Sequence, residues 1–435
     1  MTDKTMNCCG FCGQNNKIAG PFVQGNGLGE ETSVFICSSC IKSCDEALAE
    51  KLGLSESSSS REIVVPTPIE LYEHLNQYVI GQSLAKRKLS VEVSNHYQRL
   101  IDAEEVSRVK TGYEGAVIED PDLVDVEIEK SNILLIGPTG CGKTLLARSL
   151  AHKLNVPFAI GDATSLTEAG YVGEDVENLL LKLLVAADYD VEAAQRGIIY
   201  IDEIDKTRST GGNVSITRDV SGQGVQQSLL KMIEGTVCNV PPQGGRKHPE
   251  QNYIQIDTTH ILFIVGGAFV GLDDIIRRRT NKKHMGFGSK TFVVDERQEL
   301  NETLKAVTQD DLVEFGIIPE LIGRLPVIAP LEELSLDDMV RVLTEPKNAL
   351  LRQERKKLAY KGVDLKFTDD AVRKIAEIAV EKGTGARALR SVLSEFMTDI
   401  FFDLPADSKG KKYTIDADIV TKKKQLFCEN KNEAA

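Results

Sequence analysis

A glycine-rich segment of eight residues, GPTGCGKT at 137–144, constrains this chain more than any other feature. It fills each fixed position of the pattern G-x-x-x-x-G-K-[ST], which cradles nucleotide phosphates. The apolar run Ile133–Ile136 before it predicts a buried parallel strand, and residues 143–154 after it predict a helix that ends near Asn155. A chance glycine-rich turn has no reason to stand in this order of strand, loop and helix. We therefore expect an α/β fold with a parallel sheet.

Each residue type in this segment has a role at a phosphate group. The glycines let backbone N–H groups turn toward phosphate oxygens, and the helix N-terminus adds partial positive charge. We expect Lys143 to reach the β- and γ-phosphates and Thr144 to ligate Mg²⁺. The nucleotide-binding residues expected in and beside the segment are Pro138, Thr139, Gly140, Cys141, Gly142, Lys143, Thr144 and Leu145.

A second apolar run, residues 198–201, ends in two adjacent carboxylates, Asp202 and Glu203. Acidic side chains at the carboxyl end of a strand face the ligand crevice of an open α/β sheet. We expect Asp202 to hold the Mg²⁺ shell and Glu203 to orient and deprotonate the water that attacks the γ-phosphate. An acidic pair after a strand is often only a solvated turn. Downstream of a phosphate-binding loop, it predicts hydrolysis as well as binding.

Six of the nine cysteines lie in the first 44 residues, and four of these form two C-x-x-C pairs. Such pairs suit tetrahedral Zn²⁺, and a segment this small needs a metal to fold. Disulfides are disfavoured because no secretory leader is evident. Cys8 and Cys44 stay open as alternative ligands, although Cys8 could replace Cys9 only with a strained first pair. The expected ligands are Cys9, Cys12, Cys37 and Cys40.

Length and composition limit the class of protein. At 435 residues the chain exceeds what one core usually supports. The 41% apolar and 27% charged residues are typical of globular proteins, and the longest nearly apolar run, 261–272, is too short to span a bilayer. We therefore expect a cytoplasmic protein without a membrane partner. The net charge of −13 disfavours a nucleic-acid partner, which needs a basic face.

Composition along the chain predicts the domain boundaries. A serine run at 57–60 marks a flexible linker. The predicted domains are a zinc-binding domain at 1–52, a linker at 53–65, a large ATPase domain at 66–331, a small helical domain at 332–426 and a tail at 427–435.

Hydrophobic periodicity predicts the elements of the small domain and of the segments beside the nucleotide site. In the small domain we expect helices at 336–357, 369–382 and 386–402. The acidic stretch 106–130 predicts an exposed loop, and the strand at 261–265 is expected to end at Gly266 and Gly267.

Several longer motifs resemble a known family. The phosphate-binding loop, the acidic pair and GAR at 385–387 resemble the AAA+ ATPases. The four-cysteine module and four further motifs make the resemblance closer: YVIGQ at 78–82, AGYVGEDVE at 169–177, GGRKHP at 244–249 and PELIGR at 319–324. Over nearly its whole length, the chain resembles the ClpX family of AAA+ unfoldases. The resemblance implies an AAA+ module of a parallel-sheet P-loop ATPase large domain and a helical small domain, behind a small zinc-binding domain.

The resemblance also implies an activity and roles for single residues. ClpX-like proteins are homohexamers that use ATP, Mg²⁺ and Zn²⁺, unfold tagged or adaptor-delivered proteins through a central pore, and feed them to the ClpP peptidase. Val79 and Ile80 match the residues of the adenine pocket. Arg324 matches the arginine that reaches a neighbour's γ-phosphate, and Arg387 matches the sensor arginine of the small domain.

Three further sets of residues match surfaces for the substrate and the peptidase. Tyr171 and Val172 match a pore loop that grips polypeptide, although a buried tyrosine in a turn is the plainer alternative. Arg246, Lys247 and His248 match a positive collar at the pore mouth, or are simply a solvated loop. The peptidase-docking tripeptide is matched by Met285, Gly286 and Phe287.

Two other functions compete with protein unfolding. One is a DNA-acting AAA+ motor, which the net acidity and the aromatic pore loop disfavour. The other is a zinc adaptor with a degenerate ATPase, which the intact Lys143, Asp202 and Glu203 disfavour. A polar sensor residue on the strand 261–265 could not be placed, because Gly266 and Gly267 stand where one is expected.

Overall fold

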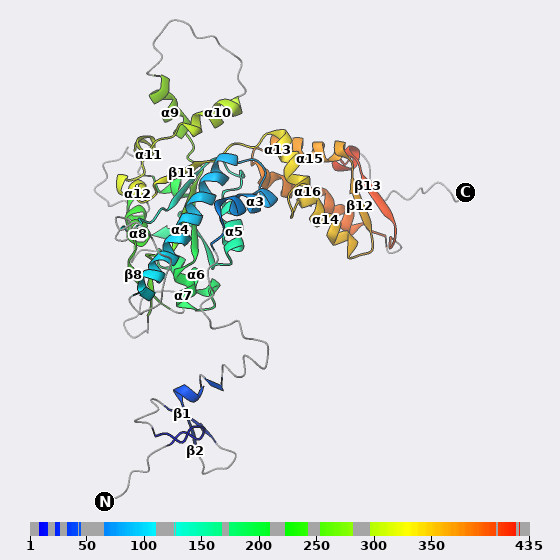
Figure 1. Cartoon of the computed structure of the whole chain (residues 1–435). Coiled ribbons are helices and arrows are strands. Elements are labelled where there is room, and N and C mark those ends of the chain that lie inside the picture. Colours follow the sequence, from blue (N-terminus) through cyan, green and yellow to red (C-terminus); the bar gives the residue numbers. More distant parts are fainter. Residues whose placement is uncertain are drawn as a thin grey trace, which may run out of the picture. The chain divides into compact units, whose positions relative to one another are not determined.

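The computed structural model describes residues 8–15, 22–26, 33–41, 43–44, 65–109, 126, 128–167, 174–208, 222–241, 253–281, 296–405, 408–422 and 426. The chain separates into two compact units, residues 1–63 and 64–435 (Figure 1). The division falls inside the predicted linker. Among the described residues, no helix combines the length and the apolar character that a membrane span requires.

The first unit has one small antiparallel sheet. Strand β1 (Phe22–Asn26) pairs with β2 (Ser33–Cys37), and Phe22 lies opposite Cys37. Among the described residues of this unit, Cys9 and Cys37 are buried, and Phe22 and Cys40 pack against them. The apolar contacts that these residues make are too few to offset the conformational entropy of ordering them, which indicates another source of stability, such as a metal.

A five-stranded parallel sheet forms the centre of the second unit. Its strand order is β11-β3-β10-β7-β4, and every neighbouring pair is parallel. The strands β3 and β10 are buried throughout, as the unbroken apolar runs predict for a sheet covered on both faces. The strands are β3 (Ile133–Ile136), β4 (Phe158–Asp162), β7 (Ile198–Asp202), β10 (Leu262–Gly267) and β11 (Val327–Pro330).

Helices and short strands surround this sheet. The helices are α3 (Pro68–Tyr78), α4 (Ser83–Val109), α5 (Lys143–Leu154), α6 (Asn178–Ala186), α7 (Val191–Gln195), the 3₁₀ helix η2 (Ile204–Thr207), α8 (Gln223–Glu234), α9 (Leu272–Asn281), α10 (Glu296–Lys305), α11 (Gln309–Phe315) and α12 (Pro319–Gly323). Two further two-stranded pairs are β5 (Leu166–Thr167) with β6 (Glu174–Asp175) and β8 (Val237–Val240) with β9 (Ile254–Asp257).

The predicted strand Ile133–Ile136 and the predicted helix 143–154 are confirmed in β3 and α5. Two left-handed residues delimit this helix: Gly142 at its start, with φ 102°, and Asn155 at its end, with φ 53°. The predicted start of the loop at 106–130 is wrong, because α4 continues to Val109. Strand β10 ends at Gly267, within the glycine pair where the sequence predicted its end. Glycine is needed at position 266 of this strand because a Cβ there would collide with the Tyr200 hydroxyl.

The small domain contains helices and a two-stranded parallel sheet, coloured yellow to red in Figure 1. Its elements are α13 (Leu336–Thr344), α14 (Leu350–Ala359), β12 (Asp364–Phe367), α15 (Asp369–Glu381), α16 (Ala386–Phe402), β13 (Lys412–Ile415) and α17 (Ala417–Val420). The single helix predicted at 336–357 is wrong. It divides because Pro346 has no N–H to donate and clashes with a preceding helical turn. The pairing of β12 with β13 was not predicted.

Candidate nucleotide site and cysteine cluster

The phosphate-binding loop joins β3 to α5 and is shaped by left-handed glycines. Gly140 and Gly142 have φ angles of 83° and 102°, which residues with a Cβ rarely adopt. The Lys143 Nζ donates to the carbonyl oxygens of Gly137 at 2.6 Å and Pro138 at 2.9 Å. The ammonium group is therefore buried inside the loop, where carbonyl oxygens hold it.

Thr144 and the acidic pair meet at the carboxyl edge of the sheet. The Thr144 hydroxyl donates to Asp202 Oδ2 at 3.3 Å, and the backbone N–H of Glu203 donates to Asp202 Oδ1 at 3.0 Å. Glu203 has a φ of 58°, a left-handed conformation that is uncommon outside glycine and is often found at functional sites. A hydroxyl and a carboxylate held together are the oxygen ligands that Mg²⁺ prefers.

Tyr200 is a polar residue of this site that sequence reasoning missed. Its hydroxyl is buried and has no hydrogen-bond partner among the described residues. Burial, and then the charge of Asp202, raise the pKa of this hydroxyl, and the nearby Thr144 side chain lowers it by less. An orphaned donor beside Thr144 and Asp202 fits a site built for a hydrated Mg²⁺ and phosphate oxygens. The signal in the sequence was the one hydroxyl inside an otherwise apolar strand.

The segment before α4 lies against the other side of the loop. Val79 and Ile80 are buried, and Val79 lies 3.7 Å from the position of a Cβ on Gly142. The Gln82 side chain bonds both backbone groups of Glu332 at 2.8 Å and reaches the Cys141 carbonyl at 3.5 Å. Gln82 thus joins this segment, the loop and the start of the small domain.

Two more predicted residues differ in exposure. Cys141 is buried, which raises the pKa of its thiol. Leu145, on the first turn of α5, is 45% exposed. An exposed leucine at this position leaves apolar surface available to a base or a ribose.

The small domain contacts the loop directly, through two glycines. The Ala386 N–H donates to the Gly140 carbonyl at 3.3 Å. A Cβ on Gly385 would lie 2.7 Å from the Thr139 carbonyl oxygen, and one on Gly140 would lie 2.5 Å from the Thr384 carbonyl oxygen. No side chain other than hydrogen fits at either position. Arg387 follows this contact and is exposed on the first turn of α16.

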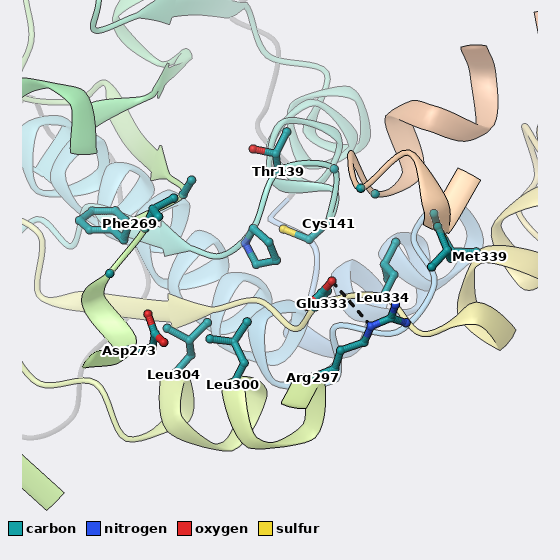
Figure 2. Close-up of a pocket in the computed structure, with 18 residues that line it drawn as sticks. Thr139, Cys141, Phe269, Asp273, Arg297, Leu300, Leu304, Glu333, Leu334 and Met339 are labelled. Carbon is teal, nitrogen blue, oxygen red and sulfur yellow. Dashed lines mark ion pairs between the residues drawn. The ribbon is translucent and has the colours of Figure 1, made fainter. Parts of the chain in front are cut away.

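A cavity of 380 Å³ lies between the loop and the segment 331–335, the hinge that joins β11 to α13 of the small domain (Figure 2). Pro138–Cys141 line one side, and Leu334 and Met339 line another. An ion pair of 3.9 Å between Arg297 and Glu333 lies at its edge. Neither Lys143 nor Asp202 lines this space. The cavity therefore belongs to the hinge side of the loop and is not the phosphate site itself.

Arg324 lies at the opposite edge of the sheet. It forms the C-cap of α12, and its carbonyl accepts from the side chain of Asn132, which directly precedes β3. Its Nε is 3.1 Å from Glu234 Oε1 on α8. The phosphate-binding loop follows the other end of β3, so Arg324 does not meet Lys143 within one chain.

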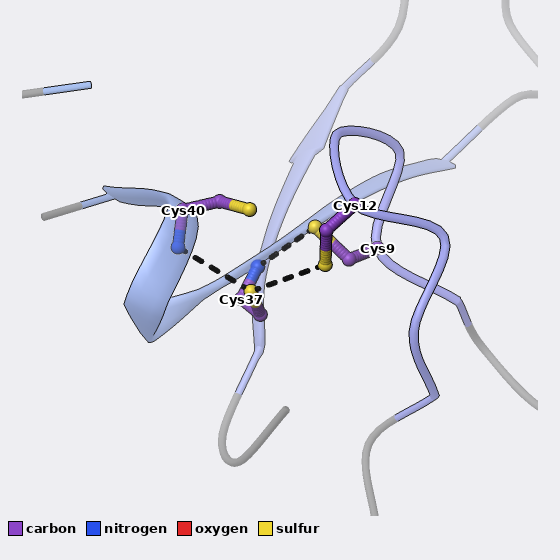
Figure 3. Close-up of side chains that lie close together, drawn as sticks. All are labelled: Cys9, Cys12, Cys37 and Cys40. Carbon is purple, nitrogen blue, oxygen red and sulfur yellow. Dashed lines mark hydrogen bonds between the residues drawn. The ribbon is translucent and has the colours of Figure 1, made fainter. Parts of the chain in front are cut away.

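Four cysteines of the first unit converge, as Figure 3 shows. The Sγ atoms of Cys9, Cys12, Cys37 and Cys40 all lie within 4.8 Å of one another. Cys9 is buried whereas Cys8 is exposed, which favours Cys9 in the first pair. Cys44 is not in the cluster.

Electrostatics favours a cation among these thiols. The Cys12 backbone N–H, followed by that of Cys37 at 3.3 Å, lowers the pKa of the Cys9 thiol to about 6. The Cys37 side chain raises the pKa of Cys40 to about 12. The thiolate form of Cys9 is therefore stabilised, whereas the neighbouring cysteines oppose ionisation of Cys40. A cation removes that opposition, and four convergent thiols suit Zn²⁺.

Eight predicted residues lie outside the residues that the structure describes. They are Tyr171, Val172, Arg246, Lys247, His248, Met285, Gly286 and Phe287.

Two protein families match consecutive parts of the chain. Residues 128–328 match the AAA domain (Cdc48 subfamily), and residues 334–415 match the C-terminal, D2-small domain of ClpB protein. The first match spans the parallel sheet with its phosphate-binding loop and acidic pair, and the second spans the small domain that contacts the loop. An AAA+ module implies that nucleotide and Mg²⁺ bind here.

Proposed function

We propose that this chain, which belongs to the AAA+ ATPases and has domains of the Clp type, is a protein unfoldase like ClpX. It would act as a homohexamer that pulls tagged or adaptor-delivered proteins through a central pore and passes them to the ClpP peptidase. One observation carries this proposal: the loop and the acidic pair lie in a Cdc48-subfamily AAA domain, and a ClpB-type small domain contacts that loop. The same chain has a unit with four convergent cysteines.

The position of Arg324 supports assembly into a ring. Its carbonyl is 3.0 Å from the Asn132 side chain, at the amino end of β3. From Asn132 to Gly137 the strand rises about 16 Å, at about 3.3 Å per residue. This is farther than an arginine side chain reaches. If Arg324 serves a γ-phosphate, that phosphate belongs to another copy of the chain.

Within one chain, the residues of the site divide the work of ATP hydrolysis. When bound, Mg²⁺ neutralises charge on the β- and γ-phosphates, and Thr144 and Asp202 would hold it. Lys143 would exchange its bonds to the loop carbonyls for phosphate oxygens. Glu203 would accept the proton of the attacking water. Arg387, at the start of α16, would report the nucleotide state to the small domain.

The remaining predicted residues contribute to substrate handling in this proposal. Tyr171 and Val172 would grip polypeptide in the pore, and bulk rather than sequence would give tolerance for many substrates. A positive collar of Arg246, Lys247 and His248 would attract a terminal carboxylate. Met285, Gly286 and Phe287 would dock the peptidase, and Zn²⁺ on the four cysteines would fold a unit for adaptors.

An unfolding assay tests the proposal. A stable fluorescent domain with a C-terminal peptide tag should lose its fluorescence with the full chain and ATP, and be degraded when ClpP is added. Glu203→Gln should bind ATP but abolish both signals, because an amide cannot accept the proton. Salt-sensitive DNA binding at micromolar protein, with no loss of fluorescence, would identify a DNA motor instead.

A second assay separates pore grip from packing at Tyr171. Tyr171→Ala should leave ATP hydrolysis intact yet slow the unfolding of a stable domain far more than the transport of an unfolded chain. A buried tyrosine would instead cost about 3 kcal/mol or more on truncation, and ATPase and assembly would fall together. Equal unfolding rates for the variant and the parent would exclude the grip.

A further inference from the structure

Two buried amide side chains hold the two ends of the short helix α12, which carries Arg324. Gln226 of α8 bonds the segment just before the helix, and Asn132 bonds the residue just after it. We propose that Gln226 and Asn132 are positioning residues that fix Arg324 for the nucleotide of an adjacent chain. This inference rests on the proposed ring, in which Arg324 acts between chains.

Gln226 is the first anchor, that is, the first amide that holds an end of α12. It is fully buried, with 0% exposed. Its Oε1 accepts from the Ile318 N–H at 2.8 Å, one residue before α12 begins. Its Nε2 donates to the carbonyl of Gly316 at 3.3 Å and to that of Thr207 at 2.8 Å. All three partners lie on other segments, so this amide fixes where the chain turns into α12.

The hydrogen bond to Thr207 links Gln226 to the segment that follows Glu203 of the same chain. Thr207 ends the 3₁₀ helix η2, which starts directly after Glu203. The same amide therefore holds the segment that follows Glu203 and the segment that leads to Arg324. A second contact holds the 3₁₀ helix η2, because the Ala268 N–H donates to Asp205 Oδ1 at 3.1 Å. Loss of the Gln226 amide should therefore displace Arg324 and leave Glu203 in place.

Asn132 is the second anchor. It is 2% exposed, and its Nδ2 donates to the Arg324 carbonyl at 3.0 Å. Its Oδ1 accepts from the Phe263 N–H at 3.3 Å, at the start of β10. Arg324 is thereby tied to β3 and β10, two strands of the sheet that are buried throughout.

The side chain of Arg324 is left able to exchange partners. Its Nε is 3.1 Å from Glu234 Oε1, with side chains that are 55% and 39% exposed. Exposed pairs of this kind contribute only about 0–1 kcal/mol. Fixing the backbone while leaving the guanidinium on a weak, exposed partner is an arrangement suited to an incoming phosphate.

Buried amides also satisfy backbone groups, so a purely structural role must be separated from positioning. The experiment uses mixed rings of the full chain, in which sites form between unlike chains. A Glu203→Gln chain lacks the acid but offers a sound Arg324, whereas an Arg324→Ala chain has the acid but offers no arginine. Mixing these two inactive variants should restore ATPase activity, and this is the positive control for the ring.

The test variants are Gln226→Met, which keeps the side-chain length, and Asn132→Asp, which keeps the acceptor for Phe263 but loses the donor to Arg324. Each should lower ATP turnover by about 100-fold, the usual effect of a small misplacement of a catalytic group. Nucleotide affinity and hexamer formation should stay unchanged. Gln227→Met, at the exposed neighbouring position of α8, should keep full activity.

A positioning role predicts one pattern of complementation. Each variant mixed with Glu203→Gln should regain activity, because the partner supplies the arginine. Each variant mixed with Arg324→Ala should stay inactive, because both chains then lack a usable arginine. Recovery with Arg324→Ala, recovery with neither partner, or parent activity of either variant alone would overturn the inference. If Gln226→Met does not fold, Asn132→Asp decides.

If the positive control itself stays inactive, the proposed ring chemistry fails, and the inference fails with it. A positive control that works beside variants that do not complement overturns only the inference.

Discussion

Replacing Gly385 with alanine should uncouple the small domain from the phosphate-binding loop. Gly385 has φ 57° and ψ −145°, a region essentially restricted to glycine, which costs other residues about 1–3 kcal/mol. The new methyl group would lie 2.7 Å from the Thr139 carbonyl oxygen and 3.2 Å from the Gly140 Cα. Carbon atoms prefer separations of about 3.5–4.0 Å, so α16 must move away from the loop.

That movement would also break the hydrogen bond from Ala386 to Gly140, worth about 0.5–1.5 kcal/mol. The combined loss is about 1.5–4.5 kcal/mol, of which the lost hydrogen bond accounts for about a third. The matched control is Gly383→Ala. Gly383 has a φ of 67° with no atom within 4 Å of a new Cβ, so it reports backbone strain without the contact.

The assay compares steady-state ATPase rates and melting temperatures of the two variants. Because Arg387 moves with α16, Gly385→Ala should turn over ATP at least about tenfold more slowly than Gly383→Ala, which corresponds to about 1.4 kcal/mol. Neither core contains these glycines, so circular dichroism should show both variants folded. Equal turnover by Gly385→Ala and Gly383→Ala would refute the idea that this contact matters.

Three other perturbations have defined outcomes. Lys143→Ala should abolish ATP binding, because no other ammonium group occupies the described loop. Titration with a fluorescent nucleotide measures the affinity, and an unchanged affinity would contradict a phosphate-binding role for Lys143. Chelation, or Cys37→Ser, should unfold residues 1–52 while the ATPase stays active, and a metal assay that finds no zinc in the untreated chain would contradict the site. Burial acts to raise the pKa of Asp311, but bonds from Arg279 at 2.8 and 2.9 Å and from Thr308 outweigh it, so the pKa is lowered. The stability from this carboxylate is present above its ordinary pKa and lost as pH falls below about 4. Asp311→Asn should therefore flatten the melting temperature between pH 5 and pH 3, and an unchanged acid slope would exclude Asp311 as its source.

The parts of the fold that the sequence predicted were those set by local chemistry. The helix after the loop ends where Asn155 adopts a left-handed conformation, and a buried parallel strand was recognisable in Ile133–Ile136. The position of the acidic pair followed from the apolar run before Asp202. Each of these signals lies within a few residues of what it determines.

The parts that could not be predicted depend on distant partners. Gln226 is recognisable as an anchor only once Thr207 and Ile318 lie beside it, and nothing in the helical pattern of α8 marks it. The need for glycine at 266 comes from the Tyr200 hydroxyl on the neighbouring strand, where a Cβ would collide. The division of the predicted helix 336–357 was different, since Pro346 was visible in the sequence and its effect was overlooked.

The parallel pairing of β12 with β13 has a mechanical consequence. These strands lie on either side of α15 and α16 in the sequence, and Asp364 and Phe367 face Lys412 and Ile415 in register. The two ends of the segment that contains α15 and α16 are therefore hydrogen-bonded side by side. Backbone hydrogen bonds from Gly410 to Gly362 and from Thr368 to Ile415 extend this pairing. A force that pulls β12 and β13 apart along the chain acts on all the hydrogen bonds between these strands together, before it acts on α15 and α16. We therefore expect the small domain to rotate as one body, so that Gly385 moves together with the rest of the domain.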